Sequence, residues 1–279
     1  MKTAYFWLTP QGKQLAEQLQ AHFGGMVEPK ADFAEAVRRA FADCDALVFV
    51  MATGIVVRTI APLVQSKASD PAVLVLDQRG KHVISLLSGH LGGANAMAEQ
   101  AAAYLGGEAV ITTATDVEHV PAFDLFAKEN HLTIENLEEL KYISGALVGG
   151  EPVSLCTAFP VEKNAFPETV QIQPFSETPR HACAVAIADT TESVAAPHVL
   201  YLRPKSLVLG VGCKKQIPPA HLEQCFRTFL QEHHLSLSAV EKLATIGLKR
   251  EEPAILALCE KYRLPLEIVA DADIQACAY

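Results

Sequence analysis

The sequence predicts an α/β protein with three parts: a three-layer N-terminal domain on a mostly parallel sheet, a small β-rich middle segment, and a second α/β domain. The uninterrupted apolar run ALVFVM at 46–51 is typical of a parallel strand buried on both faces. Similar runs alternate with helical patterns over 1–132, as in three-layer α/β domains. Short, proline-separated strand candidates fill 133–205, and the α/β rhythm returns over 206–279.

The N-terminal domain is predicted to begin with a strand and then to alternate helices and strands. Thr53 is expected to cap the helix that follows the run at 46–51. The segment QRGK separates two strand-like runs and indicates a hairpin turn. The predicted strands are 3–8, 46–51, 72–77, 82–87 and 108–116, the last running into a threonine-rich loop; the predicted helices are 11–23, 32–44, 53–65 and 92–107.

The middle segment begins with the helical pattern NLEELKYISGALVGG and continues with four strand candidates, PVSLC, TVQIQP, CAVAIAD and HVLYLRP. The run SLVLGVGC at 206–213 then opens the last domain. Helices are expected there over 219–233, 238–249 and 253–262, followed by a strand over 265–270.

The composition is that of an ordinary globular protein, with half of its 279 residues hydrophobic. A formal net charge of −9 argues against nucleic acid or an anionic membrane as partner. It is compatible with a small basic pocket for an acidic ligand. The N-terminal apolar run is too short for a signal peptide, and no run is long enough to span a bilayer. Seven scattered cysteines without a C-x-x-C pair favour reduced thiols in the cytoplasm.

Polar residues follow three of the predicted strands, where ligands bind in open α/β sheets. We expect the loops at 52–58, 88–95 and 112–116 to converge on one cleft. Helix N-termini near residues 54 and 92 present backbone N–H groups to an anion, and an arginine can hold a carboxylate with two hydrogen bonds. The candidate residues are Thr53, Gly54, Arg58, Ser88, Gly89, His90, Gly92, Gly93, Asn95, Thr112, Thr113, Thr115 and Asp116.

Each of these residues also has a purely structural interpretation. Gly92 and Gly93 suit a tight turn and close helix–sheet packing. Ser88 and His90 do not form a triad, since residues two apart on a loop rarely reach each other with the required geometry. His90 alone is a better structural or ligand-contacting residue than a base, and Asp116 equally suits a helix cap.

The C-terminal domain repeats the pattern of glycines and polar residues after a strand. The segment LGVGCKK places Gly212, Cys213 and Lys214 there, but its lone G-x-G is a weak dinucleotide signal. Two neighbouring cations favour a reactive Cys213, whereas a buried, inert thiol is the commoner case. The later segment GLKREE is typical of a solvated helix end.

Taken together, these segments resemble the cobalt-precorrin-5A hydrolase family, the cobalamin biosynthesis protein G family. The resemblance rests on GIVVR, K..DPAV, VISLLSGHLGGAN and ITTATD, in that order over about 50–116. The segments LVLGVGCKK and IGLKREE resemble the C-terminal domain of the family, and the middle matches only loosely. The resemblance spans nearly the whole chain.

The resemblance implies a step of anaerobic vitamin B12 synthesis: water opens the δ-lactone of a cobalt corrinoid, and acetaldehyde is released. The cobalt belongs to the substrate, so no protein-bound metal or organic cofactor is implied. The implied partners are the tetrapyrrole substrate and other enzymes of the pathway. The resemblance is compatible with a homodimer but does not require one. We expect catalysis from His90, Asp116 and Ser88, with His90 or Asp116 activating water. The expected substrate-binding residues are Thr53, Gly54, Arg58, Gly89, Gly92, Gly93, Asn95, Thr113, Thr115, Gly212, Cys213 and Lys214.

One departure from the family pattern concerns the C-terminus. The family continues for some tens of residues past the strand that resembles PLEIVA, whereas this chain stops at Tyr279. An incomplete C-terminal domain is therefore expected, and a non-catalytic corrinoid carrier is the alternative to an enzyme. A nucleotide-binding enzyme ranks low, because neither glycine segment completes the G-x-G-x-x-G fingerprint.

Overall fold

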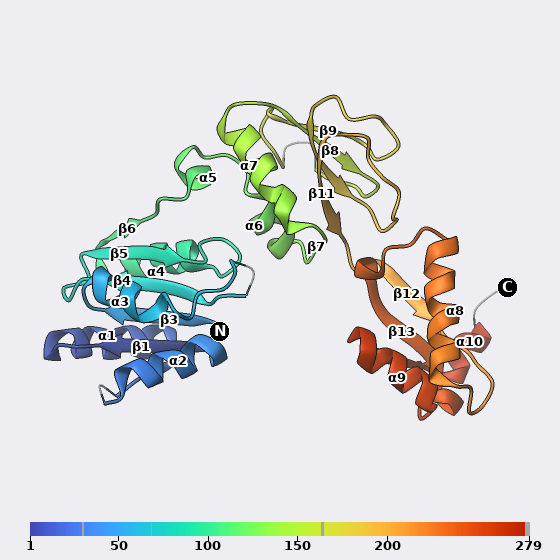
Figure 1. Cartoon of the computed structure of the whole chain (residues 1–279), viewed down its shortest axis with the longest axis horizontal. Coiled ribbons are helices and arrows are strands. Elements are labelled where there is room, and N and C mark those ends of the chain that lie inside the picture. Colours follow the sequence, from blue (N-terminus) through green and yellow to red (C-terminus); the bar gives the residue numbers. More distant parts are fainter. Residues whose placement is uncertain (30, 68, 163–164, 277–279) are drawn as a thin grey trace. The chain divides into compact units, whose positions relative to one another are not determined.

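The computed structural model describes residues 1–29, 31–67, 69–162 and 165–276. The chain divides into two compact units, the N-terminal unit Met1–Leu125 and the C-terminal unit Phe126–Tyr279. Three sheets with parallel or mixed strands, combined with helices, confirm the α/β class (Figure 1). The three-domain division and the incompleteness of the last domain stay predictions.

A six-stranded sheet forms the middle layer of the N-terminal unit, in the order β2-β1-β3-β4-β5-β6. Its central strands are buried on both faces, which explains their uninterrupted apolar sequences. The strands are β1 (Thr3–Trp7), β2 (Met26–Val27), β3 (Ala46–Val50), β4 (Ala72–Leu76), β5 (His82–Leu87) and β6 (Glu108–Val110).

Helices cover both faces of this sheet and give the expected three layers. One core lies between the sheet and α1 and α4, and a second lies between the other face and α2 and α3. The helix α1 begins at Pro10 because Thr9 caps it, accepting a hydrogen bond from the Gly12 N–H at 3.0 Å. The helices are α1 (Pro10–Phe23), α2 (Phe33–Asp43), α3 (Thr53–Ile60), α4 (Ala94–Leu105), α5 (Ala114–Val117) and α6 (Phe123–Glu129), which runs into the next unit.

The hairpin between β4 and β5 decides which loops can meet. The strands β1, β3 and β4 are parallel, whereas β5 runs antiparallel to β4, and β6 is parallel to β5. The loop after β3 therefore lies at one edge of the sheet, and the loops after β5 and β6 lie at the other. Five residues of β4 separate these edges by roughly 16 Å. The expectation that all three loops converge on one cleft is wrong.

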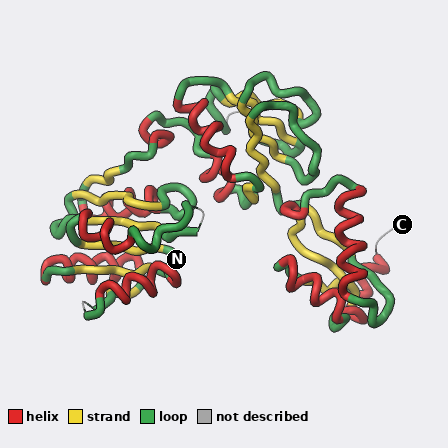
Figure 2. Tube along the Cα trace, in the orientation of Figure 1, coloured by secondary structure: helices red, strands yellow, loops and turns green. Residues whose placement is uncertain are grey.

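The C-terminal unit contains the other two sheets. The first has the order β7-β11-β10-β8-β9, is parallel except for β7, and is joined mostly by loops (Figure 2). It is packed against α7, and its four predicted strands are present. The elements are β7 (Thr133–Ile134), η1 (Leu137–Glu139), α7 (Leu140–Val148), β8 (Val153–Thr157), β9 (Val170–Pro174), β10 (Cys183–Ile187) and β11 (His198–Arg203).

The second sheet is parallel, in the order β12-β13-β14, with α8 and α9 packed against it. The helix expected over 238–249 is wrong, because Val240–Ile246 forms the central strand β13. Val240 and Leu243 of this strand lie in the core, and this tertiary contact overrides its many helix-forming residues. The elements are β12 (Leu207–Gly210), α8 (Pro219–Glu232), η2 (Leu237–Ala239), β13, η3 (Gly247–Lys249), α9 (Pro253–Tyr262), β14 (Leu266–Val269) and α10 (Asp271–Ala276).

An ionic network around the buried Arg203 joins the two sheets of the C-terminal unit. The Arg203 side chain is 3% exposed, and its guanidinium lies 2.7 Å from Glu135 Oε2. The same guanidinium donates hydrogen bonds to the backbone carbonyls of Ala188 and Thr190. Ser236 donates to the other Glu135 oxygen at 2.9 Å. These bonds satisfy the buried guanidinium and hold the two sheets together.

Candidate active site

His90 lies between two aspartates beyond the carboxyl ends of β5 and β6. Its Nε2 is 2.7 Å from Asp116 Oδ2, and its Nδ1 is 3.2 Å from Asp124 Oδ1. The side chains of His90 and Asp124 are 9% and 10% exposed, whereas that of Asp116 is 33% exposed. The cluster is thus buried on one side and reachable from solvent through Asp116.

The two carboxylates favour the charged form of the imidazole. The hydrogen bond to Asp124, with that to Asp116, outweighs the opposing effect of burial and raises the pKa of His90 from 6.5 to about 9. Burial by itself would raise the pKa of Asp124, but the hydrogen bond and positive charge of His90 bring it below its ordinary value. His90 is therefore an imidazolium at neutral pH, with both ring nitrogens engaged.

Asn95, in the first turn of α4, contacts the same oxygen of Asp116 as His90 does. Its side-chain N–H group donates to Asp116 Oδ2 at 3.0 Å and to the Thr113 hydroxyl at 3.2 Å. Its carbonyl oxygen accepts a hydrogen bond from the Ser85 hydroxyl at 2.6 Å. Asn95 is 6% exposed, so these bonds satisfy a buried amide and hold one carboxylate oxygen in place.

The glycines of this loop allow close packing around Asn95 and Ser88. A Cβ on Gly89 would lie 2.7 Å from Asn95 Oδ1, and one on Gly92 would lie 2.5 Å from Ser88 Cβ. Gly93 occupies the N-cap position of α4 with φ 88°, a conformation that favours glycine. Packing explains Gly89 and Gly92, and the backbone conformation explains Gly93.

Ser88 also has a structural role in this loop. Its backbone is left-handed, with φ 58°, and its hydroxyl donates to the backbone carbonyl of Asp70 at 2.9 Å. The Asp70 carboxylate in turn accepts hydrogen bonds from the backbone N–H groups of Gln65 and Ser66. Nearby, the Thr115 hydroxyl is buried and has no hydrogen-bond partner among the described residues.

Thr53, Gly54 and Arg58 lie on α3, at the opposite edge from His90. Thr53 is the first residue of the helix, and its N-cap is Ala52, so the predicted threonine cap is wrong. Arg58 is exposed, and its guanidinium lies back along the helix, 3.5 Å from where a Cβ on Gly54 would be. These residues form a second polar group, separate from the His90 cluster.

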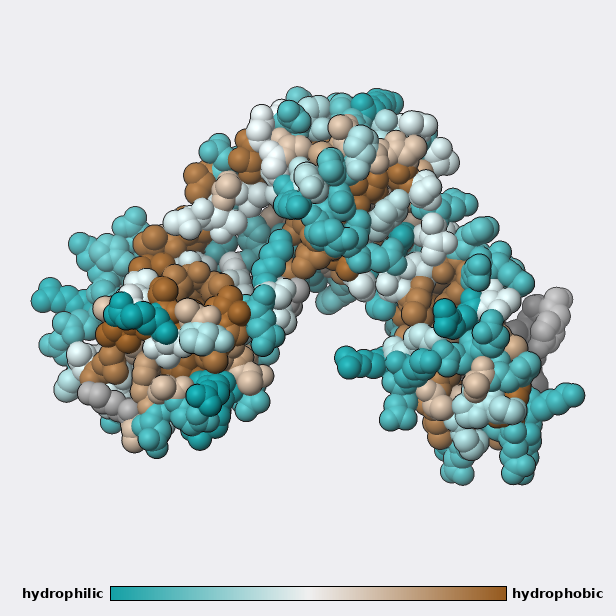
Figure 3. Space-filling view, viewed as in Figure 1, coloured by the Kyte–Doolittle hydropathy of each residue, from teal (hydrophilic) through white to brown (hydrophobic). Residues whose placement is uncertain are grey.

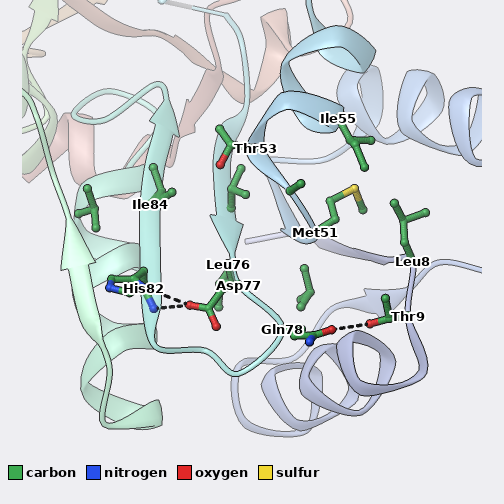
Figure 4. Close-up of a pocket in the computed structure, with 14 residues that line it drawn as sticks. Leu8, Thr9, Met51, Thr53, Ile55, Leu76, Asp77, Gln78, His82 and Ile84 are labelled. Carbon is green, nitrogen blue, oxygen red and sulfur yellow. Dashed lines mark hydrogen bonds and ion pairs between the residues drawn. The ribbon is translucent and has the colours of Figure 1, made fainter.

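A pocket of about 660 Å³ opens beside Thr53 (Figure 4). It is mostly apolar, and Ile55 and Ile84 are among the residues that line it. At the edge of the pocket, Asp77 accepts a hydrogen bond from the His82 backbone N–H at 2.7 Å. Figure 3 shows hydrophobic residues gathered on the visible face of the N-terminal unit. The pocket offers an apolar surface next to a helix N-terminus.

In the C-terminal unit, the loops after β12 and β13 meet at one edge of the sheet. Glu252 is 6% exposed, accepts a hydrogen bond from the Gln216 backbone N–H at 2.8 Å, and pairs with Lys249 at 3.2 Å. This joins the segments that contain GVGCKK and GLKREE. Cys213 is half-buried, and Lys214 is exposed. A Cβ on Gly212 would have open space, so packing does not require a glycine there.

Sequence reasoning missed Asp124. The only signal was an aspartate in the first turn of a helix that starts at Phe123, a common capping pattern that does not identify a partner. Its contact with His90 spans 34 positions of the chain and arises from tertiary folding. Among the described residues, no group of three or more His, Cys, Asp or Glu side chains is arranged to hold a metal ion. Likewise, none of the described helices combines the length and hydropathy that crossing a bilayer requires.

The fold and the site together define a multidomain α/β protein with a carboxylate–imidazolium–carboxylate cluster at the edge of a sheet. Three family models match consecutive parts of the chain: cobalamin synthesis G N-terminal at 35–116, cobalamin biosynthesis central region at 121–204, and cobalamin synthesis G C-terminus at 207–279. The chain belongs to the cobalamin biosynthesis protein G family, as the sequence motifs predicted.

Two named relatives agree with this assignment. The chain is 34% identical to the cobalt-precorrin-5A hydrolase of Salmonella typhimurium, over 95% of this chain and 80% of that protein. It is 35% identical to the enzyme of the same name from Priestia megaterium, over 80% of this chain and 63% of that protein. A solved structure of a cobalamin biosynthesis protein G homolog from Sulfolobus solfataricus covers 100% of this chain and 83% of that one, with 22% identity and a TM-score of 0.47.

Proposed function

We propose that this chain is a cobalt-precorrin-5A hydrolase. It opens the δ-lactone of a cobalt corrinoid with water and releases acetaldehyde to give cobalt-precorrin-5B. The names of two relatives at 34% and 35% identity support the substrate and the reaction class. The cobalt is part of the substrate in this proposal, and the protein contributes only side chains and backbone groups.

The geometry of Asp116 carries the chemical part of the proposal. Its Oδ2 is held by His90 and Asn95, and its Oδ1 makes no hydrogen bond within the described parts of the chain. Asp116 is also the most exposed of the three clustered charges. A carboxylate fixed at one oxygen and accessible at the other is suited to accept a proton from water.

Water activation is accordingly assigned to Asp116 rather than to His90. Asp116 Oδ1 takes a proton from water as the water oxygen attacks the lactone carbonyl, and it returns the proton to the ring oxygen as the lactone C–O bond breaks. The alcohol O–H proton then passes to the freed Asp116 carboxylate while the carbon–carbon bond to the macrocycle breaks. The electron pair of that bond passes to the conjugated macrocycle, which takes up the proton, and the two-carbon fragment leaves as acetaldehyde. His90 stays protonated and holds the carboxylate. Ser88 and Asn95 already use their donor hydrogens within the loop, so other groups stabilise the oxyanion.

Substrate carboxylates are assigned to the exposed cations and the helix N-terminus. Arg58, with the backbone N–H groups of Thr53 and Gly54, suits an acetate or propionate side chain of the macrocycle. Lys214, on the C-terminal unit, is a further candidate partner. The cytoplasmic location, the homodimer and contacts with other enzymes of the pathway stay predictions.

The test is anaerobic incubation with the cobalt-loaded lactone, with acetaldehyde trapped and the corrinoid product measured by mass. Asp116→Asn should lower turnover about 10²-fold or more if this carboxylate is the base. Glu118→Gln is the matched control, because Glu118 is an exposed carboxylate next to the same short helix. Tight corrinoid binding without acetaldehyde from the wild-type chain would instead establish a carrier.

A further inference from the structure

Asp124 is a buried carboxylate that pairs with the His90 side chain. It lies in the first turn of α6, next to Phe123, which is 1% exposed. One of its oxygens, Oδ1, accepts the Leu125 backbone N–H at 3.0 Å and lies 3.2 Å from His90 Nδ1. The aspartate is therefore fixed by its helix and faces the imidazole from the side opposite Asp116.

We propose that Asp124 is a positioning residue for the hydrolysis: it accepts the His90 Nδ1 hydrogen and so aims Nε2 at Asp116 Oδ2. This inference rests on the proposed function of the same site. It adds a residue that touches neither water nor substrate and acts only through the histidine. The chain Asp124–His90–Asp116 then leaves Asp116 Oδ1 as the oxygen that meets water.

The geometry supports this division of roles. An imidazole ring can turn about its side-chain bond, and a hydrogen bond at Nδ1 selects one orientation for Nε2. His90 Nε2 is 2.7 Å from Asp116, so a small rotation would break the shorter of its two contacts. Asp124 prevents this rotation of the imidazole ring, because the Leu125 backbone N–H of α6 holds the Asp124 carboxylate in place.

The two aspartates differ in burial, and this difference suits them to different functions. The Asp124 side chain is 10% exposed, against 33% for Asp116. A large macrocycle can approach Asp116 but not Asp124. Replacing Asp124 should therefore lower kcat while leaving KM for the corrinoid unchanged, whereas a residue that binds substrate would change KM.

The experiment compares Asp124→Asn, Asp124→Glu and Glu139→Gln with the wild-type chain. Asp124→Asn removes the charge but keeps the shape, and Asp124→Glu restores a carboxylate. Glu139→Gln is the control, since Glu139 pairs with His198 at 3.0 Å in the C-terminal unit, outside the proposed site. Kinetics with the lactone are combined with NMR titration of the His90 ring nitrogens. The charged groups that face His90 are Asp116 and Asp124, and Lys67 acts on Asp124.

Asp124→Asn should lower kcat about 10- to 100-fold at constant KM, the range observed when a carboxylate that orients a metal-bound histidine is removed. It should also lower the titration midpoint of His90, while Asp124→Glu recovers part of both and Glu139→Gln changes neither. An active wild type with unchanged kcat or unchanged His90 titration in Asp124→Asn would overturn the inference. If the wild type lacks lactone hydrolysis, the proposed function fails, and the titration alone decides whether Asp124 orients His90.

Discussion

The paired carboxylates around His90 predict that the N-terminal unit loses stability as the pH rises from neutral. In the folded protein the pKa of His90 is about 9, raised first by Asp124 and then by Asp116, against 6.5 for an unperturbed histidine. A group whose pKa is higher in the folded state contributes stability that is fully present below the unfolded value. That contribution is lost as the pH rises through the folded value.

The magnitude follows from the size of this change. A difference between 6.5 and about 9, at about 1.4 kcal/mol per pKa unit, gives an upper limit of between 3 and 4 kcal/mol, roughly. The His90 side chain is 9% exposed, so solvent screening reduces this figure far less than it would for a surface pair. We therefore expect the free energy of unfolding to fall by roughly 2–3 kcal/mol between pH 6.5 and pH 9.5.

Trp7 provides a selective assay, because it is the only tryptophan in the sequence and lies in β1 of the N-terminal unit. Urea unfolding followed by tryptophan fluorescence gives the free energy of unfolding at each pH. His90→Gln removes the titrating group while keeping a side chain that can form hydrogen bonds, so its stability should vary less over this range. Equal pH dependence in the wild type and His90→Gln would refute the reasoning.

Two further predictions concern packing and the C-terminal loops. Gly92→Ala should lower the unfolding free energy measured through Trp7 by about 1–3 kcal/mol, because the new Cβ would lie 2.5 Å from Ser88 Cβ. The control is Gly54→Ala, whose nearest contact is an ordinary 3.5 Å, so it should have little effect on stability or a favourable one. Equal losses of stability in the two variants would contradict the packing argument. Glu252→Ala should speed amide hydrogen exchange at Gln216, because the Gln216 N–H loses its hydrogen-bond acceptor. Substitution of the exposed neighbour, Glu251→Ala, should leave that exchange rate unchanged. An unchanged rate in Glu252→Ala would argue against the hydrogen bond that joins the two loops.

Most elements of the N-terminal unit could be predicted because local patterns determine them. The run at 46–51 is apolar throughout, and the structure buries every residue of β3. The helix α4 ends at Leu105, and its C-cap is Gly106, whose φ of 67° suits glycine. The strand Val240–Ile246 could not be predicted in this way, because its place between two parallel strands decided its conformation.

The arrangement of the loops shows how a correct local prediction can conflict with a global one. The turn QRGK was correctly predicted as a hairpin, and a hairpin reverses the direction of the chain. That reversal places Arg58 and His90 at opposite edges of the sheet, so the two predictions were incompatible. Loops after successive strands meet only where those strands are parallel.

The sequence by itself determined the α/β class, the family, and the segment that contains His90, Asn95 and Asp116. Short-range periodicity, glycine positions and ordered motifs were sufficient for these conclusions. Only the tertiary structure brought Asp124 to His90 and separated Arg58 from both. The reason is physical: hydrogen bonds depend on distances of about 3 Å in space, and the direction of each strand, not the order of residues, fixes those distances.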